Sequence, residues 1–490
     1  MQLLLTENKW FRALSFAFLF VVVALFAYTG KYILLLAPFV FLFLLLAGLN
    51  WKVAYWILIF TIPISMEIEL LPGSLSTSLP DEPIMWLFLI LTVLLWAHKP
   101  SILPQWWWRN TIVLVVVLQL LWTIVSVAFS TELFLSLKFL LSKIWLVTAF
   151  FVFPILVFKE KKDYKKAFIL FLIPLLATMV VILIRHAAIG FSFLMLKRAI
   201  GIIYYNHVDY STVMSMFFPL LLIAYSLCRG KWLLWNIIIV LIIFFLVAIY
   251  LTYARAAMLA VFFSLLVYAG IRLKLVKWIM PGIYVLMAML VIFMARDKEY
   301  LKYRPNYNQT YMHKTFTEHM IATLRGTDMS SMERVYRWVA GVRMSGEKPV
   351  TGYGPNGFVT HYKPFGVTSF RTYVSRNNEH STAHNYFLFM LIEQGWPAMI
   401  LYAILMVLIF ARSQTIYYRF HDRFYKKVTL GVAMLLAAGF VNNFFSDLLE
   451  NHKVGSMFYL GLALLVVLDK KSKDEEDLRK ENIPVQQPTL

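Results

Sequence analysis

The chain has 490 residues, of which 61% are hydrophobic and 17% aromatic, and its formal net charge is +20. This apolar share exceeds that of soluble globular proteins, and long apolar runs recur along the whole chain, which excludes a soluble domain. The runs are continuous rather than alternating, which excludes a β-barrel and predicts an all-α polytopic bundle of membrane-spanning helices. The single cysteine, Cys228, excludes an internal disulfide bond and a cysteine-rich metal site.

The apolar runs predict about 12 to 14 membrane spans, because roughly 20 apolar residues are needed to cross a bilayer as a helix. In chain order the spans are expected at residues 11–28, 32–48, 51–65, 84–97, 110–129, 139–158, 167–184, 209–227, 232–251, 256–272, 277–295, 396–412, 428–446 and 454–469. The first run follows Lys9 and Arg12, as in a signal peptide, but no clear cleavage site of small residues comes after it. We therefore expect an uncleaved first helix.

The distribution of Lys and Arg predicts the orientation of the spans, because the side richer in these residues stays in the cytoplasm. With a cytoplasmic N-terminus, the basic connections fall inside, among them residues 159–166 and 412–427. The acidic connection 66–83, which contains no Lys or Arg, falls outside. Because most basic residues lie in short connections, the expected partners are membrane lipids and an anionic substrate, and no nucleic acid.

A few basic residues stand against this orientation rule. Arg185, Lys197 and Arg198 lie in the outer connection 185–208, and Arg255 lies at the outer end of two spans that are joined almost without a loop. One interpretation is that these side chains reach the phospholipid headgroups. The other is a binding site for phosphate, which a guanidinium group can contact with two parallel hydrogen bonds.

Residues 296–383 form the only long connection, and it falls on the outer side. It separates N-terminal transmembrane helices (1–295) from C-terminal transmembrane helices (384–469). The charged residues 470–490 that follow are expected to form a disordered cytoplasmic tail.

The middle of the long connection predicts a helix that begins at Ser330, with Glu333 completing a capping box, and ends near Gly346. Its apolar face, expected to lie on the membrane surface, is formed by Val335, Trp338, Val339 and Val342, with Arg334 and Arg337 on another face. The glycines that follow, at 352, 354 and 357, predict a tight turn. No strand precedes them, so a structural turn is favoured over a phosphate-binding loop.

The segment 379–395, EHSTAHNYFLFMLIEQG, returns the chain to the membrane and contains two histidines four residues apart, His380 and His384. A zinc site is disfavoured because no HExxH pattern and no third ligand accompany them. A serine triad is disfavoured because no nucleophile elbow is present. Two interpretations of His384 remain: a structural histidine at a helix start, or a general base that takes a proton from a hydroxyl group. In the second case Arg198 and Arg255 would stabilise a departing anion without metal or cofactor. Asp447, Glu450 and His452, before the last span, would also line the cavity.

Four segments together resemble the O-antigen ligase and O-antigen polymerase superfamily. They are KRAIGIIYYNHVDYS (197–211), YAR (253–255), ERVYRWVAGVRMSGEKPVTGYGPNGF (333–358) and AHNYFLFMLIEQG (383–395). The resemblance covers roughly residues 195 to 465. It implies a C-type glycosyltransferase of the bacterial inner membrane, with about 12 spans, that transfers a glycan from undecaprenyl diphosphate to an acceptor at the periplasmic face without metal.

The resemblance also implies roles for individual residues. His384 corresponds to the catalytic histidine of the family, and Arg198 and Arg255 to the arginines that hold the diphosphate. The further candidates for substrate binding are Arg334, Asn206, His380, Asn385, Gly352 and Gly354.

Three acceptors are compatible with these motifs. Lipid A core would make the protein an O-antigen ligase, which is ranked first, a second lipid-linked glycan would make it a polymerase, and a protein hydroxyl group would make it an O-oligosaccharyltransferase. A transporter of an anionic lipid-linked substrate is the alternative from another class, because outer arginines would also serve binding without chemistry.

Overall fold

The computed structural model describes residues 21, 48, 50–71, 75–201, 203–310, 316–377 and 382–481. In these residues, eleven helices are long and apolar enough to cross a membrane. They are α5 (Asp81–His98), α7 (Thr111–Ala128), the continuous α8 (Leu133–Val147), η4 (Thr148–Val152) and α9 (Phe153–Val157), α10 (Lys161–Ala188), α12 (His207–Leu227), α13 (Trp232–Leu251), α14 (Arg255–Arg272), α15 (Val276–Ala295), α19 (Tyr386–Arg419), α20 (Arg423–Phe444) and α21 (His452–Glu481). The predicted all-α polytopic membrane fold is confirmed.

The N-terminal part departs from the predicted spans. The predicted spans 11–28 and 32–48 lie outside the described residues, apart from residues 21 and 48. The span expected at 51–65 is a shorter apolar helix, α4 (Trp51–Thr61), followed by the 3-10 turn η2 (Ile62–Ile64). The acidic connection after it forms an antiparallel hairpin of β1 (Met66–Leu71) and β2 (Leu75–Leu79), which the sequence analysis did not predict.

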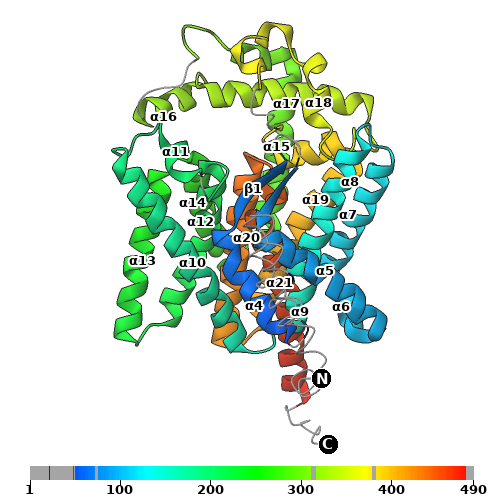
Figure 1. Ribbon diagram of the computed structural model, residues 1–490, viewed down its shortest axis with the longest axis vertical. Helices are drawn as coiled ribbons and strands as arrows, with labels where there is room; N and C mark the ends of the chain where they lie inside the picture. Colours follow the sequence, from blue (N-terminus) through cyan, green and yellow to red (C-terminus); the bar gives the residue numbers. More distant parts are fainter. Residues whose placement is uncertain are drawn as a thin grey trace, which may run out of the picture.

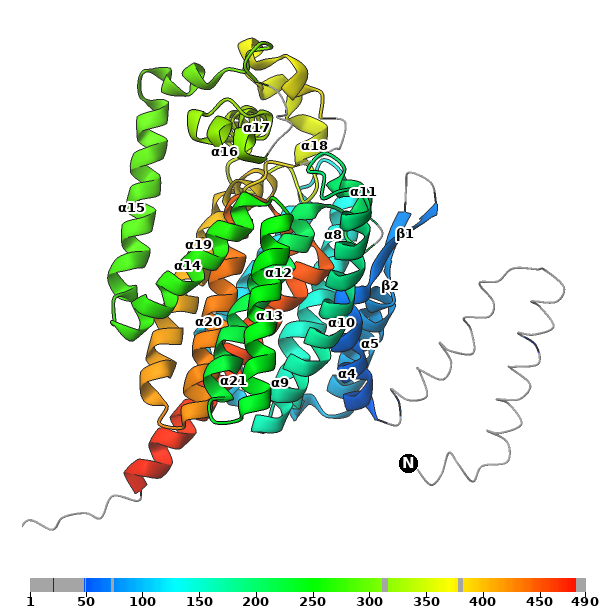
Figure 2. The same cartoon turned by 90° about the vertical axis from the view of Figure 1, so that its left-hand side faces the viewer.

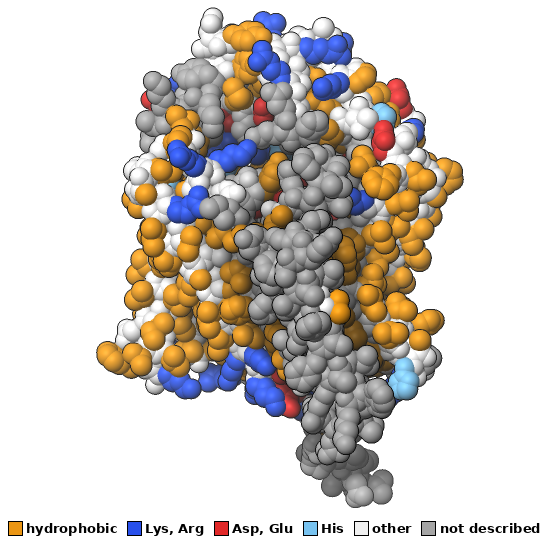
Figure 3. All heavy atoms as spheres, viewed as in Figure 1, with side chains coloured by type: hydrophobic (Ala, Val, Ile, Leu, Met, Phe, Trp, Pro, Cys, Tyr) orange, Lys and Arg blue, Asp and Glu red, His pale blue; other side chains and the backbone are white. Residues whose placement is uncertain are grey.

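The long helices stand side by side (Figure 1), and a belt of hydrophobic side chains surrounds their middle, with Lys and Arg gathered toward both ends of this belt (Figure 3). This is the surface pattern expected of a bundle that crosses a bilayer. Two connections between long helices contain a short helix: α6 (Gln105–Trp108) lies between α5 and α7, and α11 (Leu196–Ile200) lies between α10 and α12.

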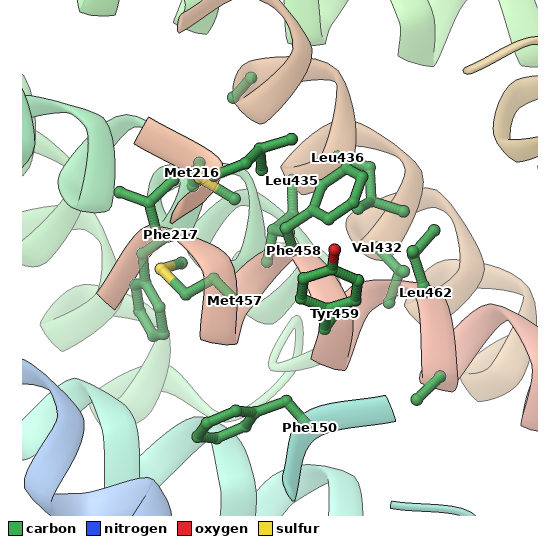
Figure 4. Packing of buried hydrophobic residues seen from close by; sticks show 14 of the residues in the cluster. Phe150, Met216, Phe217, Val432, Leu435, Leu436, Met457, Phe458, Tyr459 and Leu462 are labelled. Atoms are coloured by element: carbon green, nitrogen blue, oxygen red, sulfur yellow. The ribbon is translucent and has the colours of Figure 1, made fainter. Parts of the chain in front are cut away.

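The centre of the bundle is formed by α12, α20 and α21, which are packed by large apolar side chains (Figure 4). Met216 and Phe217 of α12 lie beside Leu435 of α20 and Met457 of α21. Small residues on α20 let its neighbours come close: a Cβ at Gly439 would already lie 3.1 Å from Cε of Met216. Close approach through small residues is the usual way in which membrane helices gain packing contacts.

Residues 296–310, 316–377 and 382–385 form a layer over one end of the bundle, with α16 (Phe316–Arg325), α17 (Met329–Glu347) and α18 (Phe358–His361). The helix α17 lies across the bundle in Figure 1 and is seen nearly end-on in Figure 2. This layer has its own apolar core, formed by Met332, Tyr336, Ala340, Met344, Tyr353, Phe358, Tyr362, Val367, Phe370, Val374, Ala383 and Ile392.

Two sequence predictions for α17 are wrong. The helix is capped by Asp328, whose carboxylate accepts from Ser331 N at 3.2 Å, rather than by Ser330. Val335 and Val339 of the predicted apolar face pack against the layer core, beside Met332, Tyr336 and Met344, but Val342 is 53% exposed and lies outside this contact. The helix therefore packs mainly against its own layer, because the aromatic side chains of residues 353–374 offer more apolar contact than a membrane surface.

The C-terminus also differs from expectation, because α21 continues to Glu481 where a disordered tail was predicted from residue 470. Oppositely charged side chains one turn apart support this extension, including Lys473 with Asp469 at 2.9 Å and Lys480 with Glu476 at 3.2 Å. Residues 482–490 lie outside the described part of the chain.

Candidate active site

A break in α19 organises the site. Gly395 has φ 77° and ψ −178°, so the helix is interrupted one residue before Trp396. The interruption frees backbone carbonyl groups, which other segments then bind: Tyr353 N donates to Ile392 O at 3.0 Å, and Trp122 Nε1 donates to Gln394 O at 2.8 Å. Buried carbonyl groups need such partners, so the break and the 351–358 turn depend on each other.

The glycine turn is a structural element at this break. Gly352 and Gly354 have φ values of 67° and 93°, which other residues rarely adopt. The backbone N–H of Gly354 donates to Glu393 O at 2.9 Å, and a Cβ at Gly352 would collide with the backbone of Glu393. The buried carboxylate of Glu393 accepts from Asn356 N at 2.7 Å. These glycines therefore hold α19 in place, and the amide groups of both already have protein partners.

His384 lies just before α19 in a left-handed backbone conformation, with φ 51°. Neighbouring side chains hold it there. Asn385 caps α19 by accepting from Leu388 N at 3.0 Å and donates to Phe444 O at 3.0 Å. Trp338 Nε1 of α17 donates to Ala383 O at 2.8 Å. A strained backbone held by several contacts is a frequent feature of functional sites.

Arg334 and Arg337 lie close enough to His384 for their charges to act on it, and Arg255 lies close to Arg334 in the same way. Arg255, the first residue of α14, donates from Nη2 to Asp328 Oδ2 at 3.1 Å, which ties the bundle to the start of α17. Arg334 donates from Nη1 to Ser330 Oγ at 2.6 Å. Arg337, only 2% exposed, donates to Asn377 Oδ1 at 3.1 Å.

Some hydrogen-bond donors of this arginine group are unused. Among the described residues, Nη1 of Arg255 and Nε of Arg334 are buried without a hydrogen-bond partner. Buried donors without partners are costly in a folded protein, so ordered water or a ligand with acceptor atoms is expected beside them. Arginine donors match the oxygens of phosphate groups.

The charges of the group act on one another and on the histidine. Burial, together with the positive charges of Arg334 and Arg337, lowers the pKa of His384 to about 3. Burial and the charge of Arg255 lower the pKa of Arg334 to about 10. Burial alone would raise the pKa of Asp328, but hydrogen bonds from Ser331 and the charge of Arg255 lower it. His384 is therefore neutral near pH 7 and accessible as a proton acceptor.

The other predicted residues lie elsewhere or have structural partners. Arg198 is exposed on α11, and within the described residues no hydrogen bond or ion pair joins it to the arginine group. Asn206 caps α12 by accepting from Val208 N at 2.8 Å and Asp209 N at 2.9 Å. His380 lies outside the described residues.

Sequence reasoning did not single out Asp328, and it placed Arg337 on the helix without a role. Arg334 and Arg337 are three residues apart and share one face of α17, whereas no local pattern in the sequence marks Asp328, which caps the helix. Among the described residues, no group of three or more His, Cys, Asp or Glu side chains is arranged to hold a metal ion.

The fold and the candidate site define a polytopic membrane protein with a group of arginines beside a histidine at one end of its bundle. Residues 239–403 match the family described as O-antigen ligase, which confirms the resemblance and identifies this part of the chain as an O-antigen ligase domain. The matched segment runs from α13 into α19 and includes Arg255, Arg334 and His384, but not Arg198 or Asn206. No curated protein matches the chain. The match over these residues supports a glycosyltransferase or ligase-type enzyme that acts on glycans in a membrane context.

Proposed function

We propose that the protein transfers a glycan from undecaprenyl diphosphate to a hydroxyl group of an acceptor, with inversion at the anomeric carbon and without metal. The observation that carries this proposal is the group of partly buried arginines, with unused donors on Arg255 and Arg334, of which Arg334 and Arg337 act electrostatically on His384. A diphosphate leaving group supplies the acceptor atoms that these donors lack.

In this mechanism His384 is the general base. Its neutral ring takes the proton of the acceptor hydroxyl group as that oxygen attacks the anomeric carbon. The bond between this carbon and the diphosphate oxygen breaks, and the electron pair leaves with the diphosphate. A base with a pKa of about 3 is weak, so the proposal requires the bound diphosphate to offset the charges of Arg334 and Arg337, which raises the pKa of His384.

Arg255 and Arg334 bind the diphosphate and stabilise the negative charge that develops on it. Arg198 is a further proposed contact from α11. The hydroxyl group of Tyr253 donates to Phe191 O at 2.9 Å, which ties the connection that carries α11 to the corner before Arg255. Asn385, Gly352 and Gly354 position His384 through α19.

The proposed location is the bacterial inner membrane, with both termini in the cytoplasm and the active site on the periplasmic face. Lipid A core is the acceptor ranked first, which makes the protein an O-antigen ligase. A second lipid-linked glycan, giving a polymerase, is ranked second, and a protein hydroxyl group third.

The test compares purified wild-type protein with the His384→Ala variant in detergent, with chelator, lipid-diphosphate-linked glycan and each candidate acceptor. Release of the lipid carrier and the size of the glycan product are followed. Loss of a general base is expected to lower the rate by about 10²- to 10⁴-fold while donor binding is retained. Cys228→Ser, at the far end of α12, is the matched control and keeps the wild-type rate.

Equal turnover by wild type and His384→Ala would remove His384 from catalysis. Turnover that stops in chelator and returns with a divalent cation would refute the metal-free mechanism. Donor binding without turnover on every acceptor would favour a transporter of an anionic lipid-linked substrate.

A further inference from the structure

A polar cavity of about 260 Å³ lies near His384 and plays no part in the mechanism above. Its walls come from the hairpin β1–β2, the helix α8, the connection between α11 and α12, and the start of α21. In Figure 1 the hairpin lies between α11 and α8, with α20 and α21 behind it. Four segments that are far apart in the sequence therefore meet around one space.

The wall of the cavity contains polar atoms that lack partners. Asp209, the third residue of α12, is only 2% exposed, and within the described residues its Oδ1 atom has no hydrogen-bond partner. The same holds for Nδ1 of His452. Buried polar atoms nearly always have a hydrogen-bond partner in proteins, so Oδ1 of Asp209 and Nδ1 of His452 are expected to bind a ligand or ordered water.

The chemistry of the wall favours a sugar. The carboxylates of Glu82, Asp209 and Glu450 can accept hydrogen bonds from the hydroxyl groups of a sugar, and the ammonium groups of Lys138 and Lys453 can donate to its oxygens. With Glu67, the carboxylates in the wall outnumber these ammonium groups, which disfavours a diphosphate. The side chain of Tyr205 is 61% exposed, so its ring offers a flat apolar face to a sugar ring. In the described part of the chain, no three of these acidic side chains and His452 are arranged to hold a metal ion.

The size of the cavity limits the ligand. Sites for drug-sized molecules begin at about 300 Å³, so this cavity suits a single sugar ring and excludes a longer glycan inside it. The remainder of any glycan would have to extend outward.

Two contacts connect the cavity with the catalytic segment. The hydroxyl group of Tyr386, two residues after His384, donates to Glu450 Oε1 at 2.5 Å, and Lys143 Nζ pairs with the same atom at 2.6 Å. Asp447 accepts from Thr382 and interacts electrostatically with both Asp209 and Arg337. The segment 382–386 therefore interacts with the cavity wall through Tyr386 and with the arginine group through His384.

We infer that this cavity binds the terminal sugar of a glycan acceptor and thereby presents its hydroxyl group to His384. The inference rests on the proposed function and deepens it, because it selects a glycan rather than a protein as the acceptor. In this arrangement the arginines bind the diphosphate of the donor, and the carboxylates of the cavity bind the acceptor sugar.

The experiment uses a single reporter thiol in the wall of the cavity. Ser142 of α8 is half-buried there, so Ser142→Cys in a Cys228→Ser background reacts with a small methanethiosulfonate reagent. The probes are methyl glycosides of hexoses and N-acetylhexosamines at millimolar concentration, with inorganic pyrophosphate for comparison. A sugar that fills the cavity is expected to slow the reaction of this thiol, and pyrophosphate is not.

Two variants connect this protection to the named residues. Asp209→Asn removes an acceptor and is expected to weaken sugar binding by about ten- to a hundredfold, the range for a hydrogen bond to a charged group. Tyr205→Ala, at an exposed side chain that folding does not require, is expected to weaken it as well, and Tyr205→Phe is expected to restore it. Protection that is unchanged in both Asp209→Asn and Tyr205→Ala would refute the inference.

The failure of this inference differs from the failure of the proposed function. Glycan transfer by a protein whose Ser142→Cys thiol no sugar protects would refute the acceptor cavity and leave the transferase intact. Protection that depends on Asp209 in a protein without transferase activity would support the sugar site and refute the proposed function. A His384→Asn variant is expected to keep the protection, because the thiol measures binding only.

Discussion

At the scale of single residues, the candidate site depends on His384 being neutral beside two cations, Arg334 and Arg337. Its ring is desolvated, and Arg334 and Arg337 add positive charge, so the pKa lies near 3 instead of its ordinary value near 6.5. In the free protein the proton-accepting form is therefore available at every physiological pH. An anion that binds the arginines offsets part of their charge and makes the same nitrogen a stronger base.

This coupling predicts how the protonation of His384 responds to its neighbours. Arg334→Gln removes one cation and is expected to raise the pKa of His384. Saturation of the wild type with pyrophosphate is expected to raise the same pKa, because the anion offsets the charge of the arginines. NMR titration of histidine-labelled protein measures both, with His384→Asn assigning the signal. Arg343→Gln, at an exposed arginine of the same helix, is the control and leaves the titration unchanged. A pKa that does not move in Arg334→Gln would contradict the electrostatic coupling.

The same depressed pKa has a consequence for stability. Between pH 6.5 and about 3 the unfolded chain binds a proton at His384 that the folded protein does not, so the contribution of this group is present above pH 6.5 and is lost as the pH falls through that window. The His384→Asn variant is therefore expected to lose less stability than wild type on acidification from pH 6.5 to 4.5. Thermal unfolding in detergent at a series of pH values measures this, and parallel curves for the two proteins would contradict it.

At the scale of secondary structure, α14 and α17 meet through one ion pair. Asp328 caps α17 and binds Arg255, and its side chain has no solvent exposure. Removing the arginine leaves a buried carboxylate without its charge partner. Arg255 therefore contributes both to the joining of the layer to the bundle and to the proposed diphosphate site.

A double variant distinguishes the structural role of Arg255 from its proposed role in binding diphosphate. Arg255→Met is expected to destabilise the protein by about 3–5 kcal/mol, the usual cost of breaking a buried pair from one side. Asp328→Asn in the same chain is expected to restore much of this loss, because asparagine is neutral and still caps a helix well. Thermal unfolding measures stability, and pyrophosphate binding remains lost in the double variant. Restored pyrophosphate binding there would show that Arg255 does not hold the anion.

The break in α19 makes a second prediction for this scale. Gly395→Ala places a Cβ at φ 77° and against Val350 O, so it is expected to destabilise by at least about 1–2 kcal/mol and to lower transferase activity by moving His384. Gly346→Ala is the matched control, since its Cβ would meet nothing within 4 Å in the last turn of α17, and it is expected to be neutral or stabilising. Equal melting temperatures for both variants would contradict the role of the break.

At the scale of the whole molecule, the layer over one end of the bundle and the basic connections at the other predict which end faces which side of the membrane. Ser369 lies exposed in the layer, and Ser101 lies exposed between α5 and α7 at the opposite end. The positive-inside rule places Ser101 in the cytoplasm.

Accessibility of engineered cysteines measures this orientation. In a Cys228→Ser background, Ser369→Cys is expected to react with a membrane-impermeant maleimide applied from the periplasmic side, and Ser101→Cys only after the membrane is opened. The reverse pattern would place the active site in the cytoplasm and overturn the proposed periplasmic reaction.

Local sequence determined much of this protein. Long apolar runs leave a chain no alternative to helices in a bilayer, so the span positions from 84 onward were predictable, as was the helix near 330–346. The turn at Gly352 and Gly354 was also predictable, because left-handed conformations favour glycine. His384, Arg255 and Arg334 were identified through motif resemblance, which carries the order of residues along the chain and not their distances.

Tertiary structure alone decided which of these residues meet. Arg255 and His384 are 129 residues apart in the sequence, and only the packing of α17 across the bundle brings Asp328, Arg334 and Arg337 between them. The same packing turned Val335 and Val339 of α17 toward the aromatic core of the layer, a neighbour that the periodicity of the helix could not identify. The sugar-sized cavity likewise exists only where four distant segments converge, since cavities depend on contacts between helices and no local pattern encodes them.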